Sequence, residues 1–222
     1  MEQNSTTWWV FGDTSEYAGH VINYLENNNQ IIVERFNRSN TDYFDPAGFI
    51  ESIKDKPMPD KIWFNANIQE PDFDYSKPII EQHEHYKNWM ATFEYGYWFK
   101  LCLLEYLEDK IIKGTFIFSS SGIAMDHGIH RDTKLYRILR KSEYTLMNTF
   151  GGSADPNAEE GFVVCGMCVS NMTDDKRKYY GEFVADYFIN GNMCRNGVYS
   201  INADESQGRF EMMFKQRGFG DV

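Results

Sequence analysis

The chain is poor in cysteine and proline, and it has no long apolar run. Its 222 residues include 4 cysteines and 6 prolines. No stretch of about 18 apolar residues occurs, which argues against a membrane-spanning helix. The first residues, MEQNSTTWW, lack the basic and then apolar layout of a secretory signal. We therefore expect a cytoplasmic protein whose cysteines are mostly reduced.

Basic residues are also scarce. Lys and Arg number 22 against 33 Asp and Glu, which gives a formal net charge of −11. Such a surface repels the phosphates of nucleic acids, so nucleic acid is not expected as a partner, although a pocket for one small anion is compatible with this charge. Hydrophobic residues make up 42%, enough for a sizeable core. Because no Pro/Gly/Ser-rich linker or charge block divides the chain, we expect a single domain, 1–222.

Strand-like and helix-like patterns alternate along the sequence. Short apolar runs typical of buried strands cover 8–11, 30–36, 60–68, 115–122, 161–168 and 197–204. Segments with helical spacing lie between them, at 16–27, 44–55, 86–107, 133–150 and 181–191. The alternation predicts an α/β fold, a Rossmann-like doubly wound sheet of about seven parallel strands between two helix layers.

Ligands of such folds bind at the carboxyl ends of the strands. Four turns fall there, at 12–18, 65–67, 119–121 and 166–170. The first, GDTSEYA, leads from a strand into a helix, where free backbone N–H groups and the helix dipole suit a phosphate. Thr14 and Ser15 add hydroxyl donors. A plain strand-to-helix turn explains the same pattern without a ligand.

Several segments, in order, resemble motifs of the short-chain dehydrogenase/reductase family, and the resemblance covers nearly all of the chain. The similar segments are GDTSEYA (the cofactor turn), FNANI (a strand end), FIFSSSG (the serine strand), CGMCVSNM (the nicotinamide segment) and residues 185–206 (the last helix, strand and tail). The resemblance implies an NAD(P)-dependent oxidoreductase that acts on a carbonyl or alcohol. Glu16 and Ala18 stand where the family has its later glycines.

The resemblance also implies catalytic residues. Tyr136 takes the place of the general acid/base, and Arg140 lies one helical turn later, where the family has a lysine. A cation at that spacing favours the phenolate form of the tyrosine, but arginine differs from lysine in shape and keeps its proton. Lys141 follows directly. A second register puts Lys141 in the lysine place and Arg137 in the tyrosine place. Packing of Tyr136 on a helix without catalysis is the alternative.

Ser120 takes the place of the serine that orients the substrate oxygen, with Ser119 and Ser121 as alternatives. The asparagine that the family carries on its long central helix should fall near 92–94, where the sequence has none, and Glu94 is a candidate replacement.

Cofactor contacts follow from the same resemblance. Asn37 and Arg38 come after the second strand, where an acid would bind a ribose diol and an arginine a 2′-phosphate. Because no acid stands there, the sequence favours NADP, with NAD as the alternative. An Arg38 that is merely solvated explains the residue equally well. The expected cofactor-binding residues are Gly12, Thr14, Ser15, Ala18, Arg38, Asp42, Asn65, Ala66, Asn67, Gly166 and Ser170.

Cys165 and Cys168 form a C-x-x-C pattern. A zinc site would need two further ligands, and Cys102 and Cys194 form no second pair. A redox dithiol normally begins a helix, whereas this pair ends a strand pattern. We therefore expect no metal and interpret the segment as a cofactor-facing loop in which Gly166 turns the chain.

The histidines carry weaker signals. His83 and His85 lie two apart in a helix or loop, a spacing that suits a metal only on a strand. His127 and His130 lie between the serine and tyrosine segments, where either could bind substrate.

Two other functions fit the sequence. One is a catalytically impaired nucleotide-binding protein of the same fold, because the tyrosine–lysine pattern is altered. The other is an interaction protein, because the 86–107 segment is rich in aromatic residues that suit an interface. For an enzyme, the same segment predicts a homodimer or homotetramer, with a small molecule as substrate.

Overall fold

The computed structural model describes most of the first half of the chain and the strands of the second. The described residues are 5–14, 16–65, 77–93, 97–108, 110, 115–120, 163–169, 197–204 and 209–215, with single helical positions at 142, 146, 178, 181, 182, 185, 186 and 189.

The described strands form one seven-stranded sheet. They are β1 (Thr6–Phe11), β2 (Ile31–Phe36), β3 (Lys61–Phe64), β4 (Thr115–Ser120), β5 (Val163–Val169), β6 (Gly197–Asp204) and β7 (Arg209–Lys215). The strands lie in the order β2-β1-β3-β4-β5-β6-β7. Strands β1 to β6 pair in parallel, and β7 pairs with β6 in antiparallel. The α/β doubly wound architecture is confirmed.

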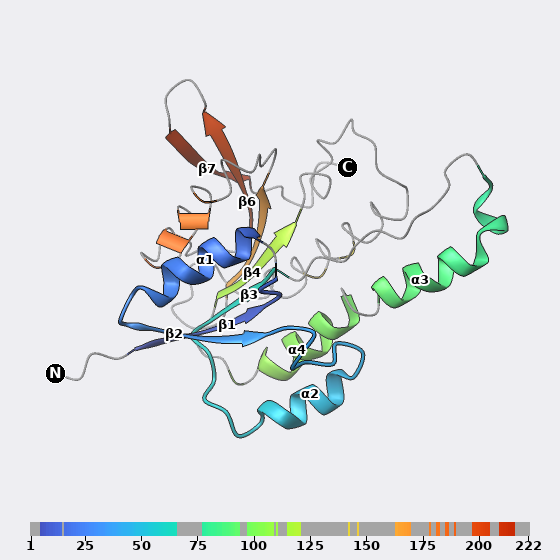
Figure 1. Ribbon diagram of the computed structural model, residues 1–222, viewed down its shortest axis with the longest axis horizontal. Helices are drawn as coiled ribbons and strands as arrows, with labels where there is room; N and C mark the ends of the chain where they lie inside the picture. Colours follow the sequence, from blue (N-terminus) through green and yellow to red (C-terminus); the bar gives the residue numbers. More distant parts are fainter. Residues whose placement is uncertain are drawn as a thin grey trace.

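The described helices are α1 (Glu16–Glu26), α2 (Pro46–Ile53), α3 (His83–Phe93) and α4 (Phe99–Glu108), with a 3-10 turn, η1, at Ile79–Glu81. Figure 1 shows α1 on one side of the sheet and α2 and α4 on the other. The chain passes from β1 through α1 to β2 on one side, and from β2 through α2 to β3 on the other side of β1. The direction of winding therefore reverses between β1 and β3, and ligands of open α/β sheets bind at such a switch point.

The core on the α2 and α4 side is aromatic. Phe11, the last residue of β1, stacks on Phe36 and Phe64 with ring centroids 4.8 and 4.7 Å apart. Phe49 of α2 and Phe99 of α4 meet the same ring edge-on at 5.7 and 5.8 Å. The buried ring of Phe11, at the end of β1, thus contacts aromatic side chains from two other strands and two helices.

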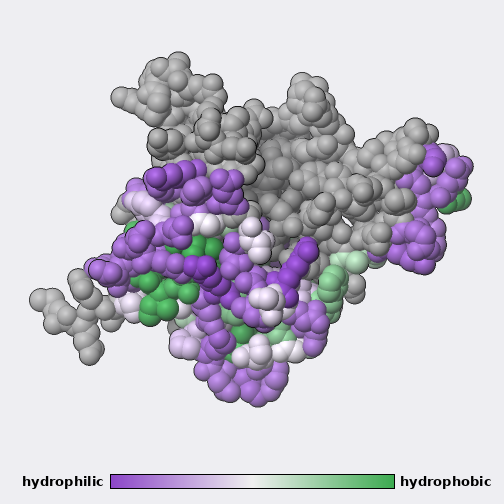
Figure 2. All heavy atoms as spheres, in the orientation of Figure 1, coloured by the Kyte–Doolittle hydropathy of each residue, from purple (hydrophilic) through white to green (hydrophobic). Residues whose placement is uncertain are grey.

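The α1 side has a smaller aromatic contact. Tyr17 meets Trp63 edge-on, with centroids 6.0 Å apart, and both side chains are buried. Burial raises the pKa of the Tyr17 hydroxyl, so Tyr17 stays protonated and is no candidate for a general base. On the face in Figure 2, hydrophilic residues predominate over the described surface, in keeping with the acidic composition.

The start of α2 follows its sequence signals. The side chain of Asp45 caps the helix by accepting a 2.9 Å hydrogen bond from the backbone N–H of Gly48, and Pro46 opens the first turn. The helix expected over 86–107 is found as α3 and α4, and residues 94–96 between them lie outside the described residues.

Two expectations about the later strands are wrong. The sheet has one antiparallel edge strand, β7, which was not expected at all because the pattern after 204 is short and mixed in polarity. Gly166 does not turn the chain: it lies inside β5, paired with Phe118 of β4 and Val198 of β6. The β-branched and apolar run that begins at Val163 simply continues as a strand through it.

Candidate functional site

The turn after β1 begins at a glycine in a left-handed conformation. Gly12 has φ of 84°, which strains any residue that carries a Cβ. Its backbone N–H donates a 2.9 Å hydrogen bond to the carbonyl of Phe36, the last residue of β2. Strand pairing therefore continues to the end of both strands before the chain turns away.

On the other side, Asn65 joins the ends of β1 and β3. Its backbone N–H donates to the carbonyl of Phe11 at 2.8 Å, and its side-chain amide donates to the carbonyl of Gly12 at 3.0 Å. Asn65 is buried. Two of the expected cofactor-binding residues, Gly12 and Asn65, are thus in direct contact at the switch point between β1 and β3.

A carboxylate lies next to this turn. The Oδ2 atom of Asp13 accepts a 3.1 Å hydrogen bond from the side-chain amide of Asn37, which follows β2. The Oδ1 atom of Asp13 is buried and has no hydrogen-bond partner, although the residue as a whole is partly exposed. A buried acceptor without a donor is unfavourable, and such atoms are often found where a ligand binds.

Asn37 is itself fixed by the loop after β2. Its side-chain oxygen accepts hydrogen bonds from the backbone N–H and the hydroxyl of Ser39, at 2.9 and 2.5 Å. The backbone N–H of Asn37 donates to the side-chain oxygen of Asn40 at 2.8 Å. With its oxygen occupied by Ser39, the amide group of Asn37 can only present its N–H side to Asp13.

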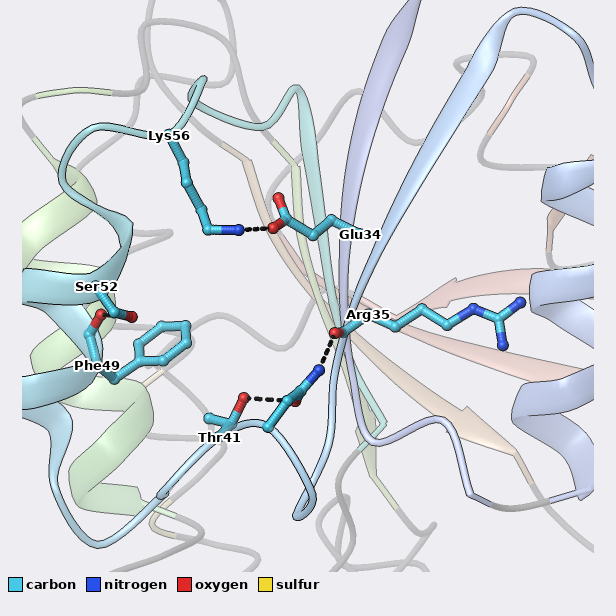
Figure 3. Close-up of polar contacts among 7 residues, drawn as sticks. Glu34, Arg35, Thr41, Phe49, Ser52 and Lys56 are labelled. Atoms are coloured by element: carbon cyan, nitrogen blue, oxygen red, sulfur yellow. Dashed lines mark hydrogen bonds and ion pairs between the residues drawn. The ribbon is translucent and has the colours of Figure 1, made fainter.

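Asn40 makes several of the hydrogen bonds of the loop after β2. It donates a 2.9 Å hydrogen bond to the backbone carbonyl of Arg35 and accepts one of 3.0 Å from the hydroxyl of Thr41 (Figure 3). Figure 3 also shows the ion pair between Lys56 and Glu34, which ties the turn after α2 to the edge strand β2. The contacts of Asn40 thus connect the loop after β2 to the backbone of Arg35 in that strand.

Comparison with known proteins identifies the fold. No family model matches the sequence, and no curated protein matches it. Among solved structures, a small-chain dehydrogenase is similar over 90% of this chain and 97% of its own, with a TM-score of 0.67 and 13% identity. A small-chain dehydrogenase in complex with NADPH is similar over 87% and 85%, with a TM-score of 0.60 and 14% identity. A short chain dehydrogenase family protein from Francisella tularensis is similar over 87% and 86%, with a TM-score of 0.58 and 13% identity.

The fold is that of the short-chain dehydrogenases/reductases. The resemblance that the sequence motifs indicated is confirmed at the level of the fold. In a sheet of this kind, the carboxyl ends of β1, β2 and β3 receive a dinucleotide. At this edge Gly12 supplies a turn without a side chain, next to Asp13, whose Oδ1 atom is buried without a hydrogen-bond partner.

The first turn of α1 departs from the glycine-rich pattern in two ways. Glu16 begins α1, and its Oε1 lies 3.9 Å from Nε2 of His20, one turn along the helix. Ala18 is completely buried, which suits close packing of α1 on the sheet more than contact with a ligand. Thr14 is exposed at the turn, and Ser15 lies outside the described residues.

Arg38 and Asp42 lie on the loop after β2, and both are exposed. The Oδ1 atom of Asp42 accepts a 2.9 Å hydrogen bond from the backbone N–H of Phe44, so this carboxylate closes a local turn. The roles of Arg38 and Asp42 as cofactor contacts stay predictions.

The expected catalytic residues fall largely outside the described part. Ser120 is the last residue of β4, at the same edge of the sheet as Gly12 and Asn65, and Ser119 precedes it. The remaining catalytic and cofactor candidates lie outside the described residues: Ala66, Asn67, Glu94, Ser121, His127, His130, Tyr136, Arg137, Arg140, Lys141 and Ser170.

The cysteine pair and the histidine pair lie in regular secondary structure, on β5 and α3. Cys165 and Cys168 both lie within β5, and a three-residue step along a strand separates Cα atoms by about 10 Å. A disulfide needs Cα atoms within roughly 7 Å. His83 and His85 lie in α3, and no cluster of three His, Cys, Asp or Glu that could hold a metal occurs in the described part of the chain.

Sequence reasoning missed Asp13 and the role of Asn37. Both residues come shortly after a strand, and the last residues of these two strands, Phe11 and Phe36, are register partners. What the sequence could not give was the pairing of β1 with β2 in that register, which brings the two side chains together.

Proposed function

We propose that the protein is an NAD(P)-dependent oxidoreductase of the short-chain dehydrogenase/reductase type, with a carbonyl or alcohol as substrate. The observation that carries the proposal is the arrangement at the carboxyl ends of β1 and β3. There Asn65 donates a hydrogen bond to Gly12, whose turn leads directly to the Asp13 carboxylate. The complex of a similar protein with NADPH supports a nicotinamide cofactor.

The roles of the residues follow from the resemblance. Ser120, at the end of β4, would donate a hydrogen bond to the substrate oxygen. Tyr136 would donate or accept the proton at that oxygen, and Arg140 or Lys141 would stabilise the phenolate. A bound nicotinamide would supply or accept the hydride, while the protein orients the reactants.

The test is turnover. Purified protein is incubated with NADH or NADPH and a panel of aldehydes and ketones, and loss of the reduced cofactor is followed by absorbance. We expect turnover with at least one carbonyl, and a loss of roughly a hundredfold or more in Tyr136→Phe. Tyr24→Phe is the matched control, because the Tyr24 hydroxyl of α1 donates a 3.3 Å hydrogen bond to Asp186 and is not among the expected site residues.

A second function is favoured by specific departures from the family pattern. Glu16 and Ala18 replace glycines of the first turn, and Arg140 replaces the lysine. These changes suit a protein that binds a dinucleotide without turning over a substrate. Cofactor binding without turnover on the whole panel, unchanged by Tyr136→Phe, would establish this function in place of the first.

We also propose that the protein acts in the cytoplasm as a homodimer or homotetramer through the 86–107 segment. None of the helices in the described residues is long and apolar enough to cross a membrane. Tyr86 and Met90, one turn apart on α3, are 41% and 40% exposed, and Trp98 just before α4 is 50% exposed. Light scattering tests the assembly: we expect a dimer or tetramer that Met90→Glu weakens, and a monomeric wild type would contradict it.

A further inference from the structure

We infer that the outer edge of β2 pairs with β2 of a second copy of this chain, in antiparallel and about a two-fold axis at Val33. The strand lies at the edge of the described sheet. In the usual doubly wound order, two strands lie on this side of the first strand. Here the stretch from β2 to β3 is described without a gap and contains α2 but no strand, so β2 has no such neighbour within it.

The backbone groups of β2 point alternately to β1 and to the outer edge, as in any parallel strand. The carbonyls of Gln30 and Phe36 accept hydrogen bonds from backbone N–H groups at the two ends of β1. The even-numbered residues therefore face β1. The odd-numbered residues direct both their N–H and their C=O to the outer edge, and they are Ile31, Val33 and Arg35.

Two of these six outward groups already have a partner. The N–H of Ile31 donates to the carbonyl of Asn28 at 2.9 Å, and the carbonyl of Arg35 accepts from the side chain of Asn40 at 2.9 Å. The other four have no hydrogen bond within the described part of the chain, namely the N–H groups of Val33 and Arg35 and the carbonyls of Ile31 and Val33. Two donors and two acceptors thus remain on the edge.

These four groups match one another in a single register. With the axis at Val33, the two copies of Val33 face each other and exchange two N–H to C=O hydrogen bonds. The N–H of Arg35 then faces the carbonyl of Ile31 in the other copy, and the symmetry repeats this bond. The two groups that already have partners face each other and are not needed. Because a shift by two residues would bring occupied groups opposite free ones, it would leave only two of the four bonds.

The side chains of β2 do not oppose the pairing. Charges on an edge strand often prevent such contacts, but Arg35 is held by Glu26 of α1 at 2.5 Å. Glu34 forms an ion pair with Lys56 in its own chain (Figure 3). Ile32 is 53% exposed, and pairing brings its two copies to diagonal positions, where long side chains reach each other.

The contact is separate from the one proposed for the 86–107 segment, and it does not depend on the proposed activity. It is isologous, because the same residues contribute from both copies. Two different isologous contacts on one chain suit a homotetramer, whereas the β2 contact alone gives a dimer.

The first test is sedimentation equilibrium of Met90→Glu, alone and combined with Val33→Pro or Val33→Thr, at about 0.15 M salt to screen the acidic surface. Proline removes an N–H that faces away from the sheet, a place where edge strands tolerate it. Threonine keeps this N–H and the branched shape, so Val33→Thr is the matched control. We expect Met90→Glu to dimerise, and Val33→Pro to raise the dissociation constant about tenfold or more, with less than about a threefold change in Val33→Thr.

A second test needs no proline variant. In a hydrogen-bonded antiparallel pair the Cα atoms lie about 5.5 Å apart, which is within the range of a disulfide. Val33→Cys should therefore give a covalent dimer under mild oxidation, and a reducing agent should reverse it. Arg35→Cys is the control, because its two copies would lie about 14 Å apart. The wild type gives the background from the 4 native cysteines.

Three results would each overturn the inference: a monomeric Met90→Glu chain, an association that Val33→Pro leaves unchanged, or equal cross-linking of the two cysteine variants. A monomer in which the amides of Val33 and Arg35 are protected from hydrogen exchange would show that another segment of the same chain covers the edge, and it too would overturn pairing between copies. If Val33→Pro is unfolded by circular dichroism, the cysteine pair decides. None of these results bears on dinucleotide binding, so the proposed function stands or falls separately.

Discussion

The side-chain amide of Asn37 donates a 3.1 Å hydrogen bond to Oδ2 of Asp13 and so joins the turns that follow β1 and β2. The bond orients the carboxylate and leaves its other oxygen without a donor. Two residues that follow different strands thus form one acceptor site, and its direction is set by the loop that holds Asn37.

Asn37→Ala should weaken binding of NADH and NADPH about threefold to tenfold, because Asp13, beside the proposed dinucleotide edge, loses the donor that orients its carboxylate. Fluorescence titration measures both affinities. Asn29→Ala, in the exposed turn before β2, is the matched control and should change neither. Unchanged affinities in Asn37→Ala would contradict a role of this contact at the dinucleotide edge.

Gly12→Ala should destabilise the protein by roughly 1–2 kcal/mol, because φ of 84° is unfavourable for a residue with a Cβ. Gly19→Ala is the matched control, since a Cβ at this position of α1 meets nothing within 4 Å. The control should stabilise the protein by roughly 0.5–1 kcal/mol through helix propensity. Urea unfolding gives both values, and equal effects would contradict the account of the turn.

Phe11→Ala should cost about 3–5 kcal/mol of unfolding free energy, because the ring lies at the centre of the aromatic core and its removal leaves a cavity. Phe44→Ala makes the same change at a side chain that is 57% exposed, and it should stay within about 0.5 kcal/mol. Chemical denaturation compares the two. Similar losses would mean that the core is not organised around Phe11.

The element types were largely predictable from sequence, because strand and helix periods are local. The start of α2 is an example: Asp45 and Pro46 are signals that act within four residues. The antiparallel β7 was not predictable, since its direction depends on pairing with β6. Gly166 was misread for the opposite reason: glycine is typical of turns, but pairing with two neighbouring strands holds this one in β5.

The candidate site was predictable only in part. Gly12 and Asn65 stand out because a glycine and an amide each end an apolar run, and the structure joins them. Asp13 and Asn37 carry no such local mark, because their contact requires β1 and β2 to be in register. The NADP preference inferred from Arg38 stays a prediction, because it depends on one exposed residue of the loop after β2.

Lys61→Met should stabilise the protein at neutral pH, and the gain should shrink as the pH rises. Burial, partly opposed by the carboxylate of Asp60, lowers the pKa of Lys61 in the folded protein. Between that lowered pKa and the ordinary value near 10.5, the unfolded state binds more protons, so wild-type stability rises with pH across this window. Below the lowered pKa the full penalty remains.

Unfolding free energies of the wild type and Lys61→Met from pH 7 to pH 10 measure the difference. Lys54→Met, at an exposed position on the turn after α2, serves as the control and should show no comparable trend. A gain that is constant or grows with pH would contradict the burial of a charged Lys61.

The central claim, that the β1/β3 edge binds a nicotinamide dinucleotide, is tested most directly by isothermal titration calorimetry of the wild-type protein with NADH and with NADPH. The account predicts saturable binding of one NADH or NADPH per chain. The absence of heat of binding for both dinucleotides, with a protein shown to be folded, would contradict it.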